Sequence, residues 1–411
     1  MADQDCVAFV NIGGVDYEAR EHKYSATVLK LADTFSITIP APDGKVRGLD
    51  GSQTPIANVA TMGARVTLAM SDPNVRGGER VTKLRGIVAG RRMQTDRDGG
   101  TTLAVTGADL GWMFSSCGRV FQNLRGLTWL EFLKKVCGLT VDPVTGSVVA
   151  DAFGWGIQGV RQTNVINRKL RLGRQVVESD FQRAAAAKTS LLVPRFQIEV
   201  GETIDQRMIQ LAKIDHFLVN VSTDGFLQIF QPDYSQAPLY SFFRYPTTDT
   251  RRKQNNIIDP SVEESGDSLY TRVQCWSSVV DTTNNDPTNP NAGRYYGKFE
   301  NTSTLPFQRL YTFTDPEQMG QDRVTSRARW QWQRFLFDSW TYSFETVGHS
   351  QNGVPFVEDT MCELHDLLYG YEGVFYVAGV EPSRKLARPG FDRGSGSRCR
   401  ITLKKPNLLA A

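Results

Sequence analysis

The feature that most constrains the fold of this chain is a set of short segments in which apolar and polar residues alternate. Phe35-Ser-Ile-Thr-Ile39 is one such segment, and Pro40 ends it. Two others, residues 8–12 and 15–19, flank the pair Gly13-Gly14, which is typical of a tight hairpin turn. A period of two places alternate side chains on one buried face of a strand. Short strands with regular turns predict a small β-barrel or sandwich at the start of the chain.

The alternation extends through the first quarter of the sequence. Val66, Leu68 and Met70 repeat it. Residues 81–93 and 101–106 predict a further pair of strands, joined by the turn residues 96–100. After Asp109 the pattern changes.

Two helix starts mark the middle of the chain. Thr128 and Glu131 have the spacing of a capping box, in which each side chain satisfies a free backbone amide. Thr203 and Gln206 have the same spacing. Apolar residues follow both pairs at helical spacing, namely Leu130, Leu133 and Val136 after the first, and Ile204, Met208, Leu211 and Ala212 after the second.

The second of these helices precedes two expected strands, 216–221 and 226–230, so the middle region reads as a compact α/β unit. A third helix is expected at 176–190, where four alanines occur in a row. Residues 140–195 otherwise show only weak periodicity.

The last third again predicts strands, with one helix between them. Residues 282–293 are rich in Asn and Pro and predict a loop. Asp315-Pro316 can open a helix, which would present one apolar stripe of Val324, Ala328, Trp332 and Phe335. Strands are expected at 270–278, 340–344, 362–364, 374–380 and 400–403.

The end of the chain thus repeats the architecture of its beginning, although no residue-level repeat is apparent. We expect a mainly β, α+β protein in which two small, similar β-barrels flank an α/β middle region. The expected domains are 1–116, 117–256 and 257–411, with a loop and helix inserted at about 283–338 of the third domain.

The charge of the chain argues against a dedicated nucleic-acid-binding protein. Lys and Arg total 47 and Asp and Glu 44, which gives a net charge of +3 spread along the sequence. Nucleic-acid binders usually carry a basic face. The nearest approach to a basic patch is Arg91, Arg92 and Arg97, with two aspartates beside them, which is typical of a solvated hairpin tip.

The cysteines indicate neither a metal site nor a disulfide framework. The six are widely separated and none form a C-x-x-C pair, so we expect buried free thiols of the kind found in proteins made in a reducing cytoplasm. The acidic amino terminus does not resemble a signal peptide, and no apolar run has the ~18 residues that cross a bilayer.

No motif in the sequence indicates catalysis, a cofactor or a metal. Gly154-Trp-Gly-Ile-Gln-Gly159 matches the dinucleotide-binding spelling but lacks the strand before it and the helix after it. His22, His216, His349 and His365 are too far apart in sequence for a short-range metal motif, and each is expected to be structural. His365 and Asp366 should point to opposite faces of a strand.

Three acidic residues, Glu263, Glu264 and Asp267, and the pair Glu358-Asp359 are candidates for an acid–base site. Neighbouring carboxylates more commonly mark a solvated turn, so we expect no enzyme activity. The tryptophans at 330, 332 and 340 have the spacing of a core or a subunit interface. We take Arg91, Arg92, Arg97, Trp330 and Trp340 as candidate assembly-interface residues.

Three groups of motifs occur in a fixed order along the chain: 35–40 with 63–68, 85–88 and 103–109; 200–203 with its helix and 224–227; and Arg327 with 347–349, 373–377 and 403–406. This order resembles the Mu-like phage baseplate hub family, also called the tail protein GpP or late control protein D group. Ala108 departs from the Gly-Arg-Asp that the family usually has at this position. The motifs cover most of the chain except 140–195 and 280–320.

The resemblance implies a homotrimer in which each chain contributes two similar barrels, so that three chains form a ring of six near-equivalent units. Such a ring would join the six-fold tail tube protein to the three-fold central spike protein, contact baseplate wedge proteins, and pass DNA only in transit. It implies no cofactor and no membrane insertion. The location implied is the tail baseplate of the virion, after synthesis in the host cytoplasm.

Two other interpretations remain open from the sequence. One is a different β-rich tail component, such as a tube-completion or fibre-attachment protein, assembled as a hexamer or as a trimer without barrels. The other is a peptidoglycan hydrolase that uses Glu263 or Glu358.

Overall fold

The structure of the chain is a computed structural model. It describes residues 6–28, 30–95, 100–116, 124, 127–141, 148–162, 202–214, 217–267, 269–280, 294–302, 305–315, 321–385 and 396–408. The expected helix at 176–190, the expected loop at 282–293, Cys117, Arg97 and His216 lie outside these residues.

The amino-terminal β-structure, which we call the first module, contains the alternating segments that open the sequence. Its buried positions follow the apolar residues: in Thr34–Pro40 the side chains of Phe35, Ile37 and Ile39 are buried. The strands of the module are β1 (Val7–Ile12), β2 (Val15–Ala19), β3 (Glu21–Thr27), β4 (Thr34–Pro40), β5 (Lys45–Arg47), β6 (Gln53–Pro55), β7 (Arg65–Ser71), β8 (Arg80–Thr95) and β9 (Thr101–Asp109), with 3-10 turns η1 (Pro42–Gly44), η2 (Ile56–Asn58) and η3 (Arg76–Gly78).

The carboxy-terminal β-structure, which we call the second module, includes a strand that lies before residue 257 in the sequence. Strand β15 precedes that residue, yet it pairs in parallel with β23 of the second module. The elements of the module are β15 (Tyr240–Arg244), η4 (Thr250–Gln254), β16 (Ile258–Glu264), β20 (Trp340–Val347), β21 (Ser350–Gln351), β22 (Val354–Pro355), β23 (Thr360–Asp366), β24 (Tyr371–Lys385) and β25 (Gly396–Lys404).

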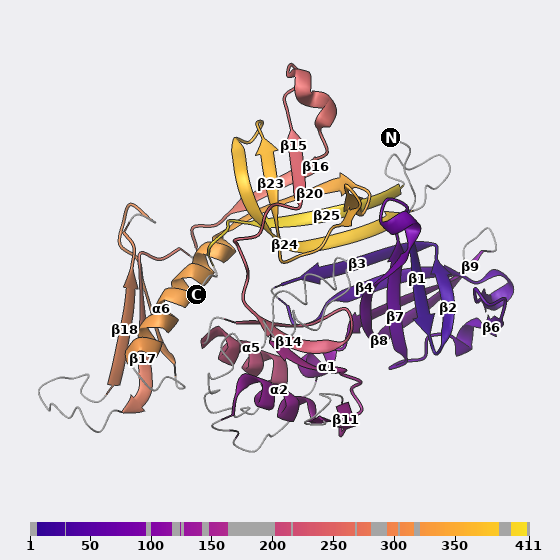
Figure 1. Cartoon of the computed structure of the whole chain (residues 1–411), viewed down its shortest axis with the longest axis horizontal. Helices are drawn as coiled ribbons and strands as arrows, with labels where there is room; N and C mark the ends of the chain where they lie inside the picture. The colour runs from indigo at the N-terminus through magenta and orange to yellow at the C-terminus, as the bar shows by residue number, and fades with distance from the viewer. Residues whose placement is uncertain are drawn as a thin grey trace, which may run out of the picture.

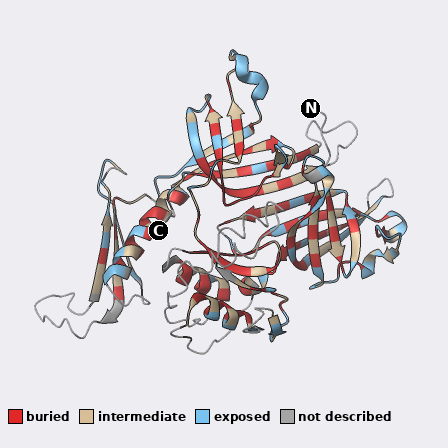
Figure 2. Cartoon of the chain, viewed as in Figure 1, coloured by how far each residue is buried: buried red, intermediate tan, exposed pale blue. Residues whose placement is uncertain are grey.

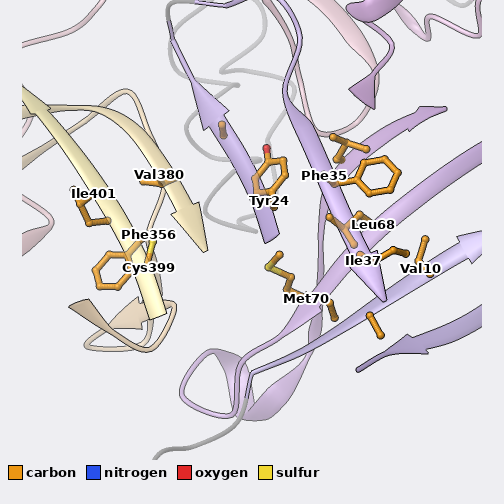
Figure 3. Packing of buried hydrophobic residues seen from close by; sticks show 14 of the residues in the cluster. Val10, Tyr24, Phe35, Ile37, Leu68, Met70, Phe356, Val380, Cys399 and Ile401 are labelled. Atoms are coloured by element: carbon orange, nitrogen blue, oxygen red, sulfur yellow. The ribbon is translucent and has the colours of Figure 1, made fainter. Parts of the chain in front are cut away.

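One continuous sheet joins the two modules. Its strand order is β16-β20-β25-β24-β3-β4-β9-β8-β7-β1-β2, and β23 and β15 extend it through β24. Figure 1 shows the yellow strands of the second module beside the indigo strands of the first, with β24 next to β3. A single hydrophobic cluster contains buried residues of both modules. Figure 3 shows Tyr24, Phe35 and Met70 on one side of it and Val380, Phe356 and Ile401 on the other.

The two modules share one pairing pattern. In the first, the order is β3-β4-β9-β8-β7; in the second, β16-β20-β25-β24-β23 takes the same order, with the strands in the same sequence along the chain and every pair antiparallel. The expectation of two similar β modules is therefore met in topology. Their closure into barrels stays a prediction, as do the expected domain boundaries.

The similarity extends to single residues, although no residue-level repeat was apparent from the sequence alone. Aligning the strand registers places Thr34-Phe-Ser-Ile37 on Thr341-Tyr-Ser-Phe344. It also places Val88-Ala-Gly90 on Val377-Ala-Gly379, and the register shifts at both of these segments. The sequence alone does not reveal this repeat because the aligned segments are only three or four residues long and are not all identical.

A backbone feature beside these shifts is also duplicated. Gly63 has φ 76° and its N–H donates to Val88 O at 2.9 Å; Asp359 has φ 59° and its N–H donates to Val377 O at 2.9 Å. Both residues have the left-handed conformation, Gly63 two residues before the start of β7 and Asp359 one residue before the start of β23. The repeat thus fixes the start of an equivalent strand in each module.

The middle region contains α1 (Trp112–Ser116), α2 (Trp129–Cys137), β10 (Leu139–Val141), β11 (Val148–Asp151), β12 (Gly159–Gln162), α5 (Ile204–Ile214), β13 (Leu218–Val221) and β14 (Phe226–Phe230). The capping box at Thr128 and Glu131 is confirmed, and Gly138 ends α2 in the left-handed conformation. The apolar stripe of α5 is also confirmed, since Ile204, Met208, Leu211 and Ala212 are buried. The two helices share one hydrophobic core with β13 and β14.

Between β16 and β20 lies a further unit, the side domain. It contains β17 (Arg272–Val280), β18 (Arg294–Glu300), β19 (Leu310–Asp315) and α6 (Gln321–Ser339), in the order β18-β17-β19. The expected stripe on α6 is confirmed: Val324, Ala328 and Trp332 are buried and Phe335 packs against them. In the first module the corresponding connection, from β3 to β4, is a short loop. The side domain is therefore an insertion into one copy of the repeat.

The fold is mainly β, with few helices, and the expected α+β class is confirmed. Figure 2 shows the buried residues along the strands of both modules and the exposed turn η4 at the top of the view. Among the described helices, none is both long and apolar enough to cross a bilayer.

Candidate assembly interface

The joint between the two modules is the pairing of β3 with the second, outer half of β24, which begins at Gly379. Thr27 pairs with Gly379 and Lys23 with Ser383, antiparallel. Lys23 Nζ lies 3.1 Å from Glu381 Oε2, and Ser25 Oγ donates to Glu381 Oε1 at 3.1 Å. The joint therefore combines a hydrogen-bonded ladder with cross-strand polar pairs, which is how antiparallel strands are stabilised.

Strand β24 pairs with two different strands along the same edge. Its first half, residues 371–377, pairs with β23, and its second half, beginning at Gly379, pairs with β3. The bulge at Val377-Ala-Gly379 lies between the two halves. A bulge bends and twists a strand, so the two halves can run in different directions. The same strand can thus belong to the sheet of its own module and to the joint.

The side chains of His22 and His349, which are far apart in the sequence, lie next to each other and buried at the joint. The rings of His22 on β3 and His349 before β21 meet edge to face, with centroids 5.3 Å apart. His349 Nε2 lies 3.0 Å from Ser383 O. The two nitrogens of His22 are buried and contact no hydrogen-bonding partner in the described structure. Both histidines have structural positions, as expected, but they were not expected to meet.

The surroundings of this pair keep both rings neutral. Burial, the adjacent His349 ring and the Arg384 guanidinium hold the pKa of His22 well below its ordinary value. Burial also lowers the pKa of His349 to about 4. Protonating either ring would place a charge between the modules, so acid should weaken the joint.

One face of the joint carries a polar hollow of about 390 Å³. Its lining includes equal numbers of acidic and basic side chains from both modules, namely Glu21, Glu345 and Glu381 with Lys23, Arg384 and Arg400. A surface with interspersed charges of both signs attracts neither anions nor cations strongly.

The expected interface arginines lie on the outer half of β8. Arg91 Nη1 donates to Ala57 O at 2.7 Å and to Val59 O at 3.2 Å, so this side chain anchors the segment at η2. Arg92 is exposed on the same strand. Arg97 lies outside the described residues.

The expected interface tryptophans are in the core of the single chain. Trp340 is 3% exposed and packs on Phe375 and Tyr371. Trp330 is 1% exposed and belongs to a cluster with Phe337 and Tyr376. The sequence allowed two roles for these tryptophans, a core or a subunit interface. Within the single chain they lie in the core and are almost completely buried.

The candidate carboxylates do not form one site. Glu263 and Glu264 lie exposed on β16, where Glu264 Oε1 accepts a hydrogen bond from Tyr371 at 2.9 Å. Glu358 and Asp359 are buried, contrary to the expected solvated turn. Asp359 precedes β23 and accepts a 2.9 Å hydrogen bond from Tyr376. The side chains of Glu264 and Asp359 thus each have a structural contact with a tyrosine.

The remaining motifs have structural roles. Residues 154–158 form a loop between β11 and β12, held by Gly156 N–H donating to Asp151 Oδ2 at 2.6 Å and by Arg65 donating to Gly154 O and Trp155 O. Strand β11 precedes the loop, contrary to the expectation, whereas a strand and not a helix follows it, as the sequence indicated. His365 and Asp366 do point to opposite faces: the His365 ring stacks on Phe243, and Asp366 is buried.

Neither a metal site nor a disulfide emerges from the residues that the structure describes. No three His, Cys, Asp or Glu side chains among them gather into a group that could hold a metal ion. The five described cysteines are buried, as expected, and none is in a disulfide with another described cysteine.

Comparison with known proteins gives structural matches only. No protein-family model and no curated protein matches the sequence. The fold matches a tail protein from Neisseria meningitidis MC58 with TM-score 0.70 and 18% identity, over 98% of both chains. It matches the 43 kDa tail protein of prophage MuSo2 from Shewanella oneidensis with TM-score 0.67 and 16% identity, over 98% of this chain and 99% of that one.

A more distant match extends the comparison to secretion systems. An Escherichia coli component of the type VI secretion system, itself described as similar to T4 bacteriophage tail proteins, gives TM-score 0.51 and 8% identity, over 98% of this chain and 80% of that one. The chain therefore has the fold of Mu-like prophage tail proteins, and the resemblance seen in the sequence motifs is confirmed at the level of fold.

Proposed function

We propose that this protein is the structural hub of a contractile tail or a related injection apparatus, in which three copies form a ring. The observation that carries the proposal is the duplication of one β module within one sheet. Three chains with two equivalent modules each supply six similar units. Such a ring can contact a six-fold tube on one face and a three-fold spike on the other.

The structural matches support this interpretation, because two proteins that share the fold over nearly the whole of both chains are tail proteins. The proposed role is mechanical and not catalytic. The partners would be a second and third copy of the chain, the tail tube protein, the central spike protein and baseplate wedge proteins, within the virion.

The polar hollow at the joint suits a surface along which DNA or protein passes without being held. Its acidic and basic side chains are balanced, and the whole chain has a net charge of only +3. A basic lining would grip DNA through its phosphates.

The mass of the protein in solution tests the proposal. Light scattering on the purified chain should give three times the 45.9 kDa chain mass. A hexamer would instead favour a tube-completion component, and a chain that stays monomeric at high concentration would contradict a hub.

A further inference from the structure

Besides β2 and β15, which each pair with one strand only, two edges of the large sheet remain open in the described part of the chain, those of β16 and of part of β8. Strand β16 ends the sheet and pairs only with β20. Strand β8 pairs with β7 only as far as Ile87, so its outer half, residues 90–95, has β9 on one side and no strand on the other. Open edges present unpaired backbone groups to any strand that can reach them.

The internal repeat makes these edges equivalent to the two strands of the module joint. Strand β16 corresponds to β3, since each pairs with the equivalent strand β20 or β4. The outer half of β8 corresponds to the outer half of β24, since each follows a Val-Ala-Gly bulge. In the second copy of the pattern both halves of a joint therefore exist, but they do not meet.

The two open edges cannot pair within one chain. Six strands separate β16 from β8 in the sheet, and in Figure 1 they lie in different modules. They can meet only if β16 of one copy reaches β8 of another.

We propose that β16 of one copy pairs antiparallel with residues 90–95 of β8 in the next copy, in the register that β3 and β24 use within the chain. The inference rests on the proposed trimer and names the surface that closes it. The ring would then contain six joints of one kind, three within chains and three between chains, in one continuous sheet.

The register follows from the intrachain joint. There, Ala26 pairs with Val380 and Lys23 with Ser383, which sets Ser25 opposite Glu381. The equivalent positions are Glu263 for Ser25 and Arg92 for Glu381. By the same rule Glu264 lies opposite Arg91, and Val262 opposite Met93.

The side chains at these positions are complementary. Glu263 and Glu264 are acidic and exposed, and Arg92 is basic and exposed. Met93 is 47% exposed and would be covered by Val262. Opposite charges directly across two strands stabilise the pair, and like charges destabilise it. No other register of these short edges brings both acidic residues opposite both arginines.

Paired cysteines test the register directly. In the variant Arg92→Cys with Glu263→Cys, the two sulfurs lie across one cross-strand pair, within reach of a disulfide. After mild oxidation, a non-reducing gel should show covalent species ending at three chains. Arg92→Cys with Val262→Cys is the matched control, because neighbouring residues point to opposite faces of a strand, and it should stay uncrosslinked, as should the unmodified chain.

Charge exchange tests the chemistry. Arg92→Glu and Glu263→Arg should each raise the concentration at which the trimer dissociates by roughly tenfold, and the chain with both changes should return to the original value. A trimer in which the cysteine pair stays uncrosslinked, or in which the double exchange does not restore assembly, would overturn this joint and leave the proposed trimer standing. An unmodified chain that remains monomeric would overturn both.

Discussion

At the scale of single residues, two glycines set how closely β8 and β9 approach. A Cβ built on Gly86 would lie 1.9 Å from Ala108 O, and one built on Gly107 would lie 2.2 Å from Ile87 O. Neither neighbour can move away without breaking the ladder, because both are backbone atoms. Any side chain at these positions must push the two strands apart.

We expect Gly86→Ala to lower the free energy of unfolding by about 1–3 kcal/mol, the usual cost of overpacking. Urea denaturation followed by circular dichroism measures this change. Gly100→Ala is the matched control, since nothing lies within 4 Å of a Cβ built there, and its stability should equal that of the original chain. Equal losses for both variants would contradict the role of the close approach.

The buried histidine pair predicts loss of stability in acid. The pKa of His349 is lowered to about 4 and that of His22 is also lowered. Below the ordinary histidine pKa, the unfolded chain therefore binds more protons at these two residues than the folded chain does. Stability due to this pair is therefore complete above pH ~6.5, the ordinary histidine pKa, and is lost as the pH falls below it.

The variant His22→Leu should lose less stability than the original chain between pH ~6.5 and pH 4, by up to about 1.4 kcal/mol for each pH unit. Asp72, Lys83 and Arg384 also act on this pair and are present in both proteins, so the comparison isolates the ring. Urea midpoints at several pH values provide the measurement. Parallel pH profiles for the two proteins would rule out the assignment.

Residue patterns within one segment could be predicted from the sequence, and contacts across the chain could not. The capping box at Thr128 depends on residues three positions apart, so spacing alone revealed it. His22 and His349 meet because β3 and β24 pair, which no local pattern encodes. Spacing showed that Trp330 and Trp340 would be buried, but a core and an interface have the same signature.

At the scale of elements, helix α2 begins where its capping box satisfies free backbone amides. In α2, Thr128 Oγ1 accepts from the Glu131 N–H, and Glu131 Oε2 accepts from the Thr128 N–H at 2.9 Å. The helix buries Trp129, Phe132 and Leu133 against the middle-region core. A change at its cap should therefore affect one helix and leave the two modules intact.

We expect Thr128→Ala to destabilise α2 by about 1 kcal/mol, because the alanine leaves a helix amide without its acceptor. Hydrogen–deuterium exchange should become faster within residues 129–137 and stay unchanged in β3 and β24. Thr128→Ser keeps the oxygen and should restore slow exchange. Equal exchange in the alanine and serine variants would show that the cap adds nothing.

Whether a segment forms a helix or a strand could be predicted from the sequence more readily than which strand it pairs with. The periods of two and 3.6 residues located most strands and helices. The parallel pairing of β15 with β23 joins segments more than a hundred residues apart, so β15 was assigned to the middle region. The internal repeat was hidden for a similar reason, since its two copies differ in length by the whole side domain.

At the scale of the whole molecule, the chain is two equivalent modules joined through β3 and β24, with the middle region and the side domain attached. In the proposed ring of three chains, the duplicated module gives each chain two similar units. In the proposed trimer it would provide six similar contacts for one partner and three for another. The open edges at β8 and β16 are the places where the same joint can form again between copies.

Single-particle electron microscopy of the purified, assembled chain tests this account most directly. We predict a closed ring with three-fold symmetry, in which six alike β modules alternate around the axis and β16 of each chain lies against β8 of the next. A particle with one module per repeat, or modules that face away from each other between chains, would contradict it.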